Sequence, residues 1–259
     1  MSNFEILPFP PERRVVVDSG YLAAHRHLIY GFLEVDITQA RQILRDRSDQ
    51  EGNRLSFTAF LVASLARAIK SIPKVQAYRD WRGRLVVFHD VDVVTMIEPE
   101  PGAVAIPHII RNAENKSVSE ITAEIRHVQS NPNASEQRGS LYKLGIRAPR
   151  PLRLLFFKLV KKNPHWMKRY QGTVVITSVG MFGKGGGWGL AFLPVHTLGF
   201  TIGGIAQKPG VNEGKISIRE YLNLTISFDH DIVDGAPAAR FAKKFVDLLE
   251  NASALTEVH

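Results

Sequence analysis

The amino-acid sequence predicts one α+β domain that spans residues 1–259. Helix-type and strand-type hydrophobic patterns alternate along the chain, without an internal repeat or a low-complexity linker that would mark a domain boundary. With 44% hydrophobic and 22% charged residues, a chain of this length can bury a sizeable core. Only residues 131–171 depart from the pattern, and we interpret them as a basic elaboration of the domain.

Helices are predicted where apolar residues recur every three or four positions. The run from Leu55 to Lys70 is apolar on almost all sides and has Ser56 as its candidate N-cap, which is typical of a buried helix. Further helices are predicted at 36–47, 117–129, 152–162 and 236–250. Ser119 and Thr122 are the alternative caps of the 117–129 helix, and Pro237 fits the first turn of the last helix.

Strands are predicted where β-branched and other apolar residues alternate or run together between turn residues. Six segments meet this description: 84–88, 91–97, 103–110, 173–177, 197–202 and 216–228. The proline- and glycine-rich residues 98–102 between two of these strands predict a turn.

The composition excludes several classes of protein and site. The chain has no cysteine, which excludes disulfides, thiolate metal sites and a cysteine nucleophile. Its first residues lack the layout of a signal peptide, and no apolar run reaches the roughly 18 residues that a membrane span needs. We therefore expect a soluble, cytoplasmic protein. The nine histidines are scattered rather than spaced as zinc ligands, so no metal site is expected.

Positive charge is concentrated in one segment. The net charge is +8, and residues 138–170 hold ten basic residues and no acidic one, which leaves about −2 (8 − 10) for the rest. General nucleic-acid binders carry basic faces with readout motifs, so no nucleic-acid partner is expected. Three interpretations stay open: a solvated helix packed on the core or on another subunit, a surface that steers an acidic partner, and an amphipathic helix on an anionic membrane. The first is preferred, with the second superimposed.

The segment from His230 to Gly235 carries the strongest indication of chemistry. It follows a predicted strand and precedes the last predicted helix. An imidazole at a strand end can act as a general base near neutral pH, and a carboxylate four residues later, Asp234, can support it. His230 can equally be a buried structural histidine. Asp234 can also be the N-cap of the last helix, and we assign it both the capping and the orienting role.

This segment resembles the His-x-x-x-Asp-Gly signature of the dihydrolipoamide acyltransferases, the core subunits of 2-oxo acid dehydrogenase complexes, and of the chloramphenicol acetyltransferases. Four further sets of residues resemble that family in the same order: 13–16 with 33–38, 55–62, 91–97 with 102–113, and 172–183. The resemblance covers nearly the whole chain. It implies a chloramphenicol-acetyltransferase-like two-layer sandwich, in which helices pack on a mixed sheet.

The resemblance also implies an activity, the transfer of an acyl group between coenzyme A and a thiol acceptor, normally dihydrolipoyl. His230 would deprotonate the thiol, whose unperturbed pKa lies above neutrality. Thr177 would stabilise the oxyanion of the tetrahedral intermediate, with the adjacent Ser178 as its competitor. In the family, the histidine and the hydroxyl come from neighbouring subunits of a homotrimer.

Two further residues acquire roles through the resemblance. Asp234 of the family motif pairs with an N-terminal arginine, for which Arg13 is the candidate, and Gly235 supports the turn. The glycine-rich residues 183–187 lack the order of a phosphate-binding loop and are interpreted as a flexible turn.

Three departures from the family pattern leave the acyl acceptor open. The chain is too short to include the lipoyl and subunit-binding domains that usually precede the catalytic domain, Asp231 stands where an arginine is common, and the connection before Gly172 is longer and more basic. A lipoyl group on a separate protein, together with dehydrogenase components, is one set of partners. The alternatives are transfer to a small-molecule hydroxyl or amine, and a catalytically silent scaffold or regulatory protein.

Overall fold

The computed structural model describes residues 4–10, 13–51, 54–98, 105–135, 148–179, 185–191, 193, 195–212 and 214–256. The predicted turn at 99–102, the first part of the basic segment (136–147) and the start of the glycine-rich turn (183–184) lie outside the described residues.

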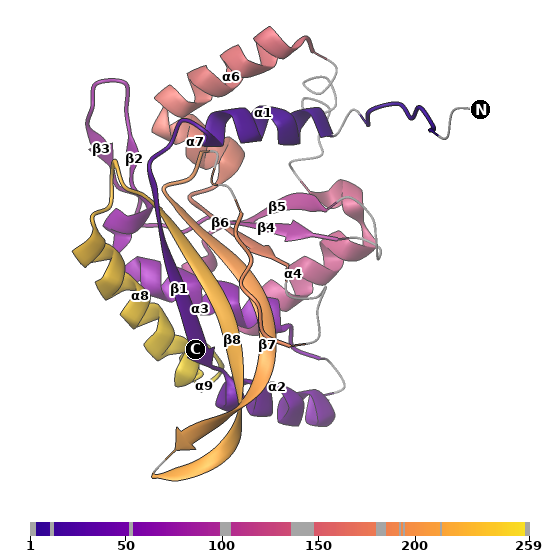
Figure 1. Ribbon diagram of the computed structural model, residues 1–259, viewed down its shortest axis with the longest axis vertical. Helices are drawn as coiled ribbons and strands as arrows, with labels where there is room; N and C mark the ends of the chain where they lie inside the picture. The colour runs from indigo at the N-terminus through magenta and orange to yellow at the C-terminus, as the bar shows by residue number, and fades with distance from the viewer. Residues whose placement is uncertain are drawn as a thin grey trace.

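A mixed six-stranded sheet organises the molecule (Figure 1). Its strand order is β1-β8-β7-β6-β4-β5. The strands are β1 (Leu28–Asp36), β4 (Val93–Ile97), β5 (Ile106–Ile110), β6 (Val174–Ser178), β7 (Leu198–Asn212) and β8 (Lys215–Asp229). The pairs β4–β6 and β6–β7 are parallel, and the other pairs are antiparallel. Two short strands, β2 (Tyr78–Arg79) and β3 (Leu85–Val86), pair separately.

Helices α3, α4 and α8 cover one face of this sheet and complete the predicted two-layer sandwich (Figure 1). The helices are α1 (Arg13–Ala23), α2 (Thr38–Glu51), α3 (Phe57–Ser71), α4 (Val118–Ser130), α6 (Arg150–Lys162), α7 (Pro164–Gln171), α8 (Gly235–Glu250) and α9 (Ser253–Thr256), with 3-10 turns η1 (Pro73–Gln76), η2 (Ala113–Asn115) and η3 (Pro132–Ala134). Helices α3, α4 and α8 bury their apolar sides against the strands in one hydrophobic core. Within the described ranges, no helix combines the length and apolar composition that crossing a bilayer requires.

The core explains why the helix predictions succeeded. Helix α3 is buried along most of its length, and Ser56 caps it as predicted by accepting a hydrogen bond from the Ala59 amide (3.3 Å). In α8, the buried rings of Phe241 and Phe245 lie 6.2 and 5.2 Å from the ring of Phe200. Aromatic packing of this kind joins the last helix to the centre of the sheet.

Two local predictions were wrong. The cap of α4 is Ser117, which forms a capping box with Glu120, whereas Ser119 and Thr122 lie inside the helix. The Thr122 hydroxyl instead donates to the Val118 carbonyl (2.7 Å). Of the strand predicted at 84–88, only Leu85–Val86 is extended.

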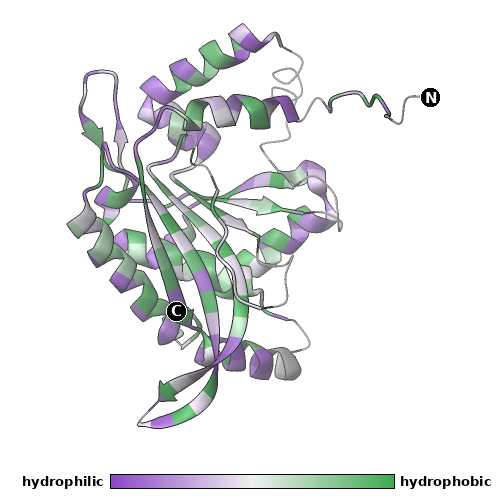
Figure 2. Ribbon diagram, in the orientation of Figure 1, coloured by the Kyte–Doolittle hydropathy of each residue, from purple (hydrophilic) through white to green (hydrophobic). Residues whose placement is uncertain are grey.

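Strand β7 is longer than the sequence predicts, whereas β8 matches its predicted range to within one residue at each end, and the two strands project beyond the sheet. Each has 15 residues, but β1 pairs with β8 only from Asp229 to Tyr221, and β6 pairs with β7 only as far as Ile202. Residues 209–212 and 215–218 therefore form a two-stranded extension, which we call the distal ribbon (Figures 1 and 2). Val211, Ile216 and Ile218 in the distal ribbon are 77, 80 and 73% exposed.

Candidate active site

His230 lies in a tight turn at the end of β8. The turn is held at both ends by buried residues, Asp229 and Val233. The amides of Ile232 and Val233 donate to the Asp229 carbonyl (3.0 and 2.9 Å), and the amide of His230 donates to the His27 carbonyl (2.8 Å). His230 itself is exposed. The fold therefore fixes the backbone of this histidine and leaves its imidazole accessible, so it is not a buried structural histidine within one chain.

A buried ion pair forms the base of the turn. The Arg26 guanidinium pairs with the Asp229 carboxylate, and their side chains are only 3 and 10% exposed. The same guanidinium donates to the His196 carbonyl (2.9 Å), and Asp229 Oδ1 accepts from the Asp231 amide (3.2 Å). Removing one partner of such a pair leaves a buried charge uncompensated. Sequence analysis missed both residues, although Asp229 directly precedes the histidine of the motif.

His196 lies behind this ion pair. Its Nε2 donates to the Gln171 carbonyl (2.6 Å), which links the residues before β7 to the end of α7. Burial, reinforced by the nearby Arg26 charge, lowers the pKa of His196 to about 4. This imidazole is therefore neutral at neutral pH and has a structural role.

A second histidine pairs with the residue that follows His230. His27 Nδ1 lies 3.0 Å from Asp231 Oδ1, and the two side chains are 82 and 45% exposed. The hydrogen bond from His27 lowers the pKa of Asp231, but an ion pair this exposed contributes little to stability. The same charges act on Lys161 of α6, an exposed residue. Partial desolvation and the Arg26 charge lower its pKa, and the Asp229 charge raises it.

The structure does not bring Arg13 to Asp234. Asp234 occupies the N-cap position of α8, but its side chain makes no capping hydrogen bond. Arg13 begins α1, and both residues are exposed. Gly235 has open space where a Cβ would lie, so no steric contact within the described residues requires glycine there.

Thr177 and His230 are far apart within one chain. Thr177 pairs with Thr201 on β7, which pairs with Thr225 on β8. His230 follows Thr225 by five residues, which corresponds to roughly 16 Å along a strand. Ser178 is exposed and points to the opposite face of the sheet from Thr177. A site that uses both Thr177 and His230 must therefore combine two chains.

The side chain of Thr177 lies on the sheet face that is turned away from the helical core. On β8, this face carries polar side chains. Leu222, Leu224, Ile226 and Phe228 point into the helical core, whereas Asn223, Thr225 and Ser227 are buried on the other face. Part of that face is covered by residues 185–191, because Gly186 lies against the Asn223 amide. The Thr225 hydroxyl and Asn223 Oδ1 have no hydrogen-bond partner within the described parts of the chain.

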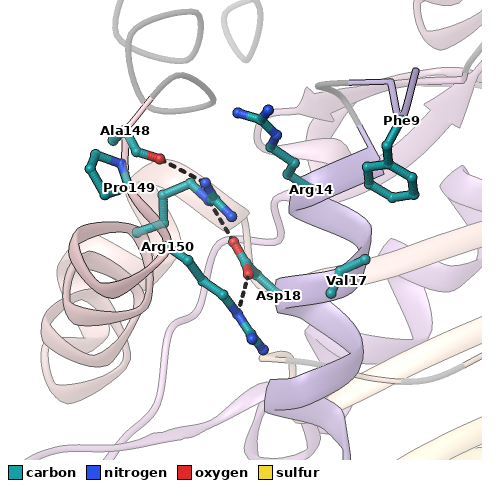
Figure 3. A pocket seen from close by; sticks show the side chains of 8 residues that line it. Phe9, Arg14, Val17, Asp18, Ala148, Pro149 and Arg150 are labelled. Carbon is teal, nitrogen blue, oxygen red and sulfur yellow. Dashed lines mark hydrogen bonds and ion pairs between the residues drawn. The ribbon is translucent and has the colours of Figure 1, made fainter.

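A cavity of about 410 Å³ lies elsewhere, between α1 and α6 (Figure 3). Its lining includes Phe9, Asp18 and Arg153 but no predicted site residue. Among the residues that the structure describes, no three His, Asp or Glu side chains gather into a group that could hold a metal ion.

The helix-backed mixed sheet, with an exposed histidine at the end of its last strand, defines the chloramphenicol-acetyltransferase-like fold. Chloramphenicol acetyltransferase itself superposes with a TM-score of 0.51 at 17% identity, covering 96% of this chain and 99% of that protein. The chain belongs to the family described as 2-oxoacid dehydrogenases acyltransferase (catalytic domain), whose model matches residues 14–138 and 161–257. The unmatched residues 139–160 lie within the segment that we interpreted as an elaboration.

Two further comparisons are informative. The lipoamide acyltransferase component of the branched-chain alpha-keto acid dehydrogenase complex of Pseudomonas putida is 26% identical over 263 residues, which cover 98% of this chain and 54% of that protein. The chain spans about half the length of the curated relatives it matches. A dihydrolipoamide acetyltransferase of Azotobacter vinelandii superposes with a TM-score of 0.72 at 22% identity, covering 98% of this chain and 96% of that one. Its structural study addresses the roles of a serine, a histidine and an asparagine in the catalytic mechanism.

Proposed function

We propose that this chain is a catalytic domain that transfers an acyl group between coenzyme A and a dihydrolipoyl thiol. The observation that carries the proposal is the exposed His230, held at the end of β8 by buried neighbours, in a chain of the acyltransferase family. A general base must reach the proton that it removes. An accessible imidazole on a fixed backbone meets that requirement.

In the proposed reaction, His230 accepts the proton of the attacking thiol. Proton transfer from a thiol to an imidazole is a feasible general-base step near neutral pH. The thiolate attacks the thioester carbonyl, and the Thr177 hydroxyl of a neighbouring subunit donates a hydrogen bond to the oxyanion. When the tetrahedral intermediate collapses, the departing thiolate takes the proton back from His230. No covalent enzyme intermediate forms.

The proposed site lies between subunits of a homotrimer. The separation of Thr177 and His230 within one chain, roughly 16 Å along the strand direction, supports this arrangement. The Azotobacter study supports the types of residue, because its histidine and asparagine are four positions apart, like His230 and Asp234. The proposal gives Thr177 and Asp234 the places of that serine and asparagine.

The partners follow from the same proposal. Coenzyme A is a co-substrate, the lipoyl group is carried on a separate protein or domain, and no step requires a metal. The Pseudomonas putida relative is a component of a dehydrogenase complex, which supports dehydrogenase components as further partners. The buried hydroxyl and amide groups along β8, which include Thr225 and Asn223, would suit a polar substrate arm better than an apolar one.

The test measures the free coenzyme A formed from a panel of acyl-coenzyme A esters, separated by chromatography from the other thiols. Dihydrolipoamide, a lipoyl domain, a small-molecule hydroxyl or amine, and water are the alternative acceptors. The substitution His230→Ala should reduce transfer to dihydrolipoyl acceptors about 100- to 10,000-fold, with an unchanged circular dichroism spectrum and trimer mass. His127→Ala, at an exposed histidine on α4, is the matched control. Transfer that survives His230→Ala, or that uses only hydroxyl or amine acceptors, would contradict the proposal. A wild-type protein inactive with every acceptor would favour a silent scaffold.

A further inference from the structure

The outward face of α6 is apolar. Leu152, Leu155, Phe156 and Leu159 are 58, 52, 50 and 49% exposed. Their spacing of i, i+3, i+4 and i+7 places them on one side of the helix, and we call them the α6 apolar face. The buried residues of α6, Arg153 and Val160, lie roughly 100° around the helix axis from this face. An amphipathic helix normally turns its apolar side inward, whereas the four side chains of this face are about half-exposed.

An ion pair buried beneath α6 fixes this orientation (Figure 3). Asp18 of α1 is fully buried, and its Oδ2 lies 2.7 Å from Arg153 Nε. Arg153 also donates to the Ala148 carbonyl (2.7 Å), and Arg150 Nε lies 3.5 Å from Asp18 Oδ1. Rotating α6 to bury its apolar face would separate these charges, which is costly in a buried setting.

The surroundings of the α6 apolar face are basic and aromatic. Residues 150–171 contain seven basic and no acidic residues. Lys158 and Lys162 are exposed and lie one helical turn apart beside the apolar face. On α7, Tyr170 extends the face by ring contact with Phe156 (6.2 Å), and Trp166, four residues earlier, is 48% exposed. Leucine and phenylalanine on one side, lysine on the flank and aromatic residues at the edge are typical of helices that lie in a membrane interface.

Most of this helix lies outside the family match. Residues 150–160 fall in the segment that the family match omits, and α6 lies at one end of the molecule, apart from the helices that cover the sheet (Figure 1). In Figure 2, hydrophobic and hydrophilic residues alternate along α6. The core of the domain does not depend on the α6 apolar face, because none of the four residues belongs to it.

We propose that α6 docks this protein on an anionic lipid bilayer. Leu152, Leu155, Phe156 and Leu159 insert at the boundary between headgroups and acyl chains, and Lys158 and Lys162 contact lipid phosphates. A second copy of the same face is disfavoured because it would oppose basic residues to basic residues. A protein partner is less well matched, since the centre of the face offers only hydrocarbon and its rim offers flexible ammonium groups rather than directional hydrogen bonds.

The experiment is co-sedimentation of the full chain with vesicles. Vesicles of phosphatidylcholine alone are compared with vesicles of equal parts phosphatidylcholine and phosphatidylglycerol. The wild type should bind only the anionic vesicles, with a blue shift of tryptophan fluorescence that Trp166→Phe abolishes. Lys158→Gln with Lys162→Gln should weaken binding about thirty-fold, because each lysine near an anionic surface contributes about a five-fold factor.

Matched control variants show whether vesicle binding depends on the α6 apolar face or on exposed leucines and lysines in general. Leu155→Ser with Leu159→Ser should weaken vesicle binding about ten-fold or more, whereas Leu85→Ser, at another exposed leucine, should not. Lys243→Gln with Lys244→Gln removes the same charge from α8 and should also leave binding unchanged. His230→Ala should bind vesicles like the wild type, which keeps this inference independent of acyl transfer. Thermal melts of each variant check that it is as stable as the wild type before its vesicle binding is compared.

Four outcomes would overturn the proposal. They are no binding to anionic vesicles, equal binding by the leucine double variant, equally tight binding to poly-L-glutamate, and a change in the oligomeric mass of the leucine double variant without vesicles. The second would show that charge alone accounts for vesicle binding and that the α6 apolar face does not insert. The third would indicate an acidic protein partner, and the fourth a subunit interface.

Discussion

Activity should be recoverable by mixing two chains that are each inactive. The perturbation is co-expression of His230→Ala and Thr177→Val chains in equal amounts, with different affinity tags that select mixed trimers. Within one chain the two residues are roughly 16 Å apart along the strand direction, so each site would take its histidine from one subunit and its hydroxyl from the next. With random assembly, half of the sites have an intact histidine and half of these an intact hydroxyl. About one quarter of the sites should therefore be complete.

The assay measures, by chromatography, the free coenzyme A formed from acyl-coenzyme A with dihydrolipoamide as acceptor. Co-expressed chains should show about 25% of the wild-type rate before selection of mixed trimers, whereas each variant alone should fall about 100-fold or more. A double variant co-expressed with the wild type provides the control: about one quarter of the sites should be active if the two residues act between chains, and about one half if they act within one chain. No recovery from the first pair, or one half from the second, would refute the reasoning.

Three further predictions concern stability. Below pH 6.5 the unfolded chain binds a proton at His196 that the folded chain, with a pKa of about 4, does not; the free energy of unfolding should therefore fall by about 3 kcal/mol between pH 6.5 and 4. His196→Gln should flatten this part of the pH profile in urea titrations, and an unchanged slope would contradict the assignment. Phe241→Ala, at a fully buried ring, should cost about 3–5 kcal/mol in chemical denaturation, and much more than Phe32→Ala at a 55% exposed ring. Asp18→Asn should cost about 3–5 kcal/mol because it leaves Arg153 buried without its charge partner; thermal melts of Asp18→Leu with Arg153→Met should recover most of that loss, and an equally unstable double variant would count against the ion pair.

The sequence was most informative where burial determines the pattern of residues. Helix α3 and the inner part of β8 are buried along most of their length, so their near-continuous apolar runs predict them well. The outer part of β7 escaped prediction because residues 203–212 contain glycine, proline and polar residues. At the outer end of β7, exposure on both faces removes the alternation on which strand prediction depends; the β8 side of the distal ribbon was within a predicted strand.

In the candidate site, the sequence likewise predicted local features but not contacts between distant residues. The motif around His230 located the turn, because the local order of residues carries that information. Arg26 and Asp229 were not predicted as a pair, since they are 203 positions apart and only the pairing of β1 with β8 brings them together. The expected pairing of Arg13 with Asp234 illustrates the reverse, because a partner inferred by resemblance does not meet the carboxylate in this chain.

The distal ribbon has a consequence for how association can be followed. Two strands without further neighbours are at best marginally stable in water, and the distal ribbon also exposes three aliphatic side chains. Its backbone amide hydrogens should therefore exchange rapidly with solvent in the isolated chain, and slowly in an assembly in which another subunit covers the ribbon. Hydrogen–deuterium exchange at Val211, Ile216 and Ile218 thus tests, without substrate or label, whether the distal ribbon belongs to a subunit interface.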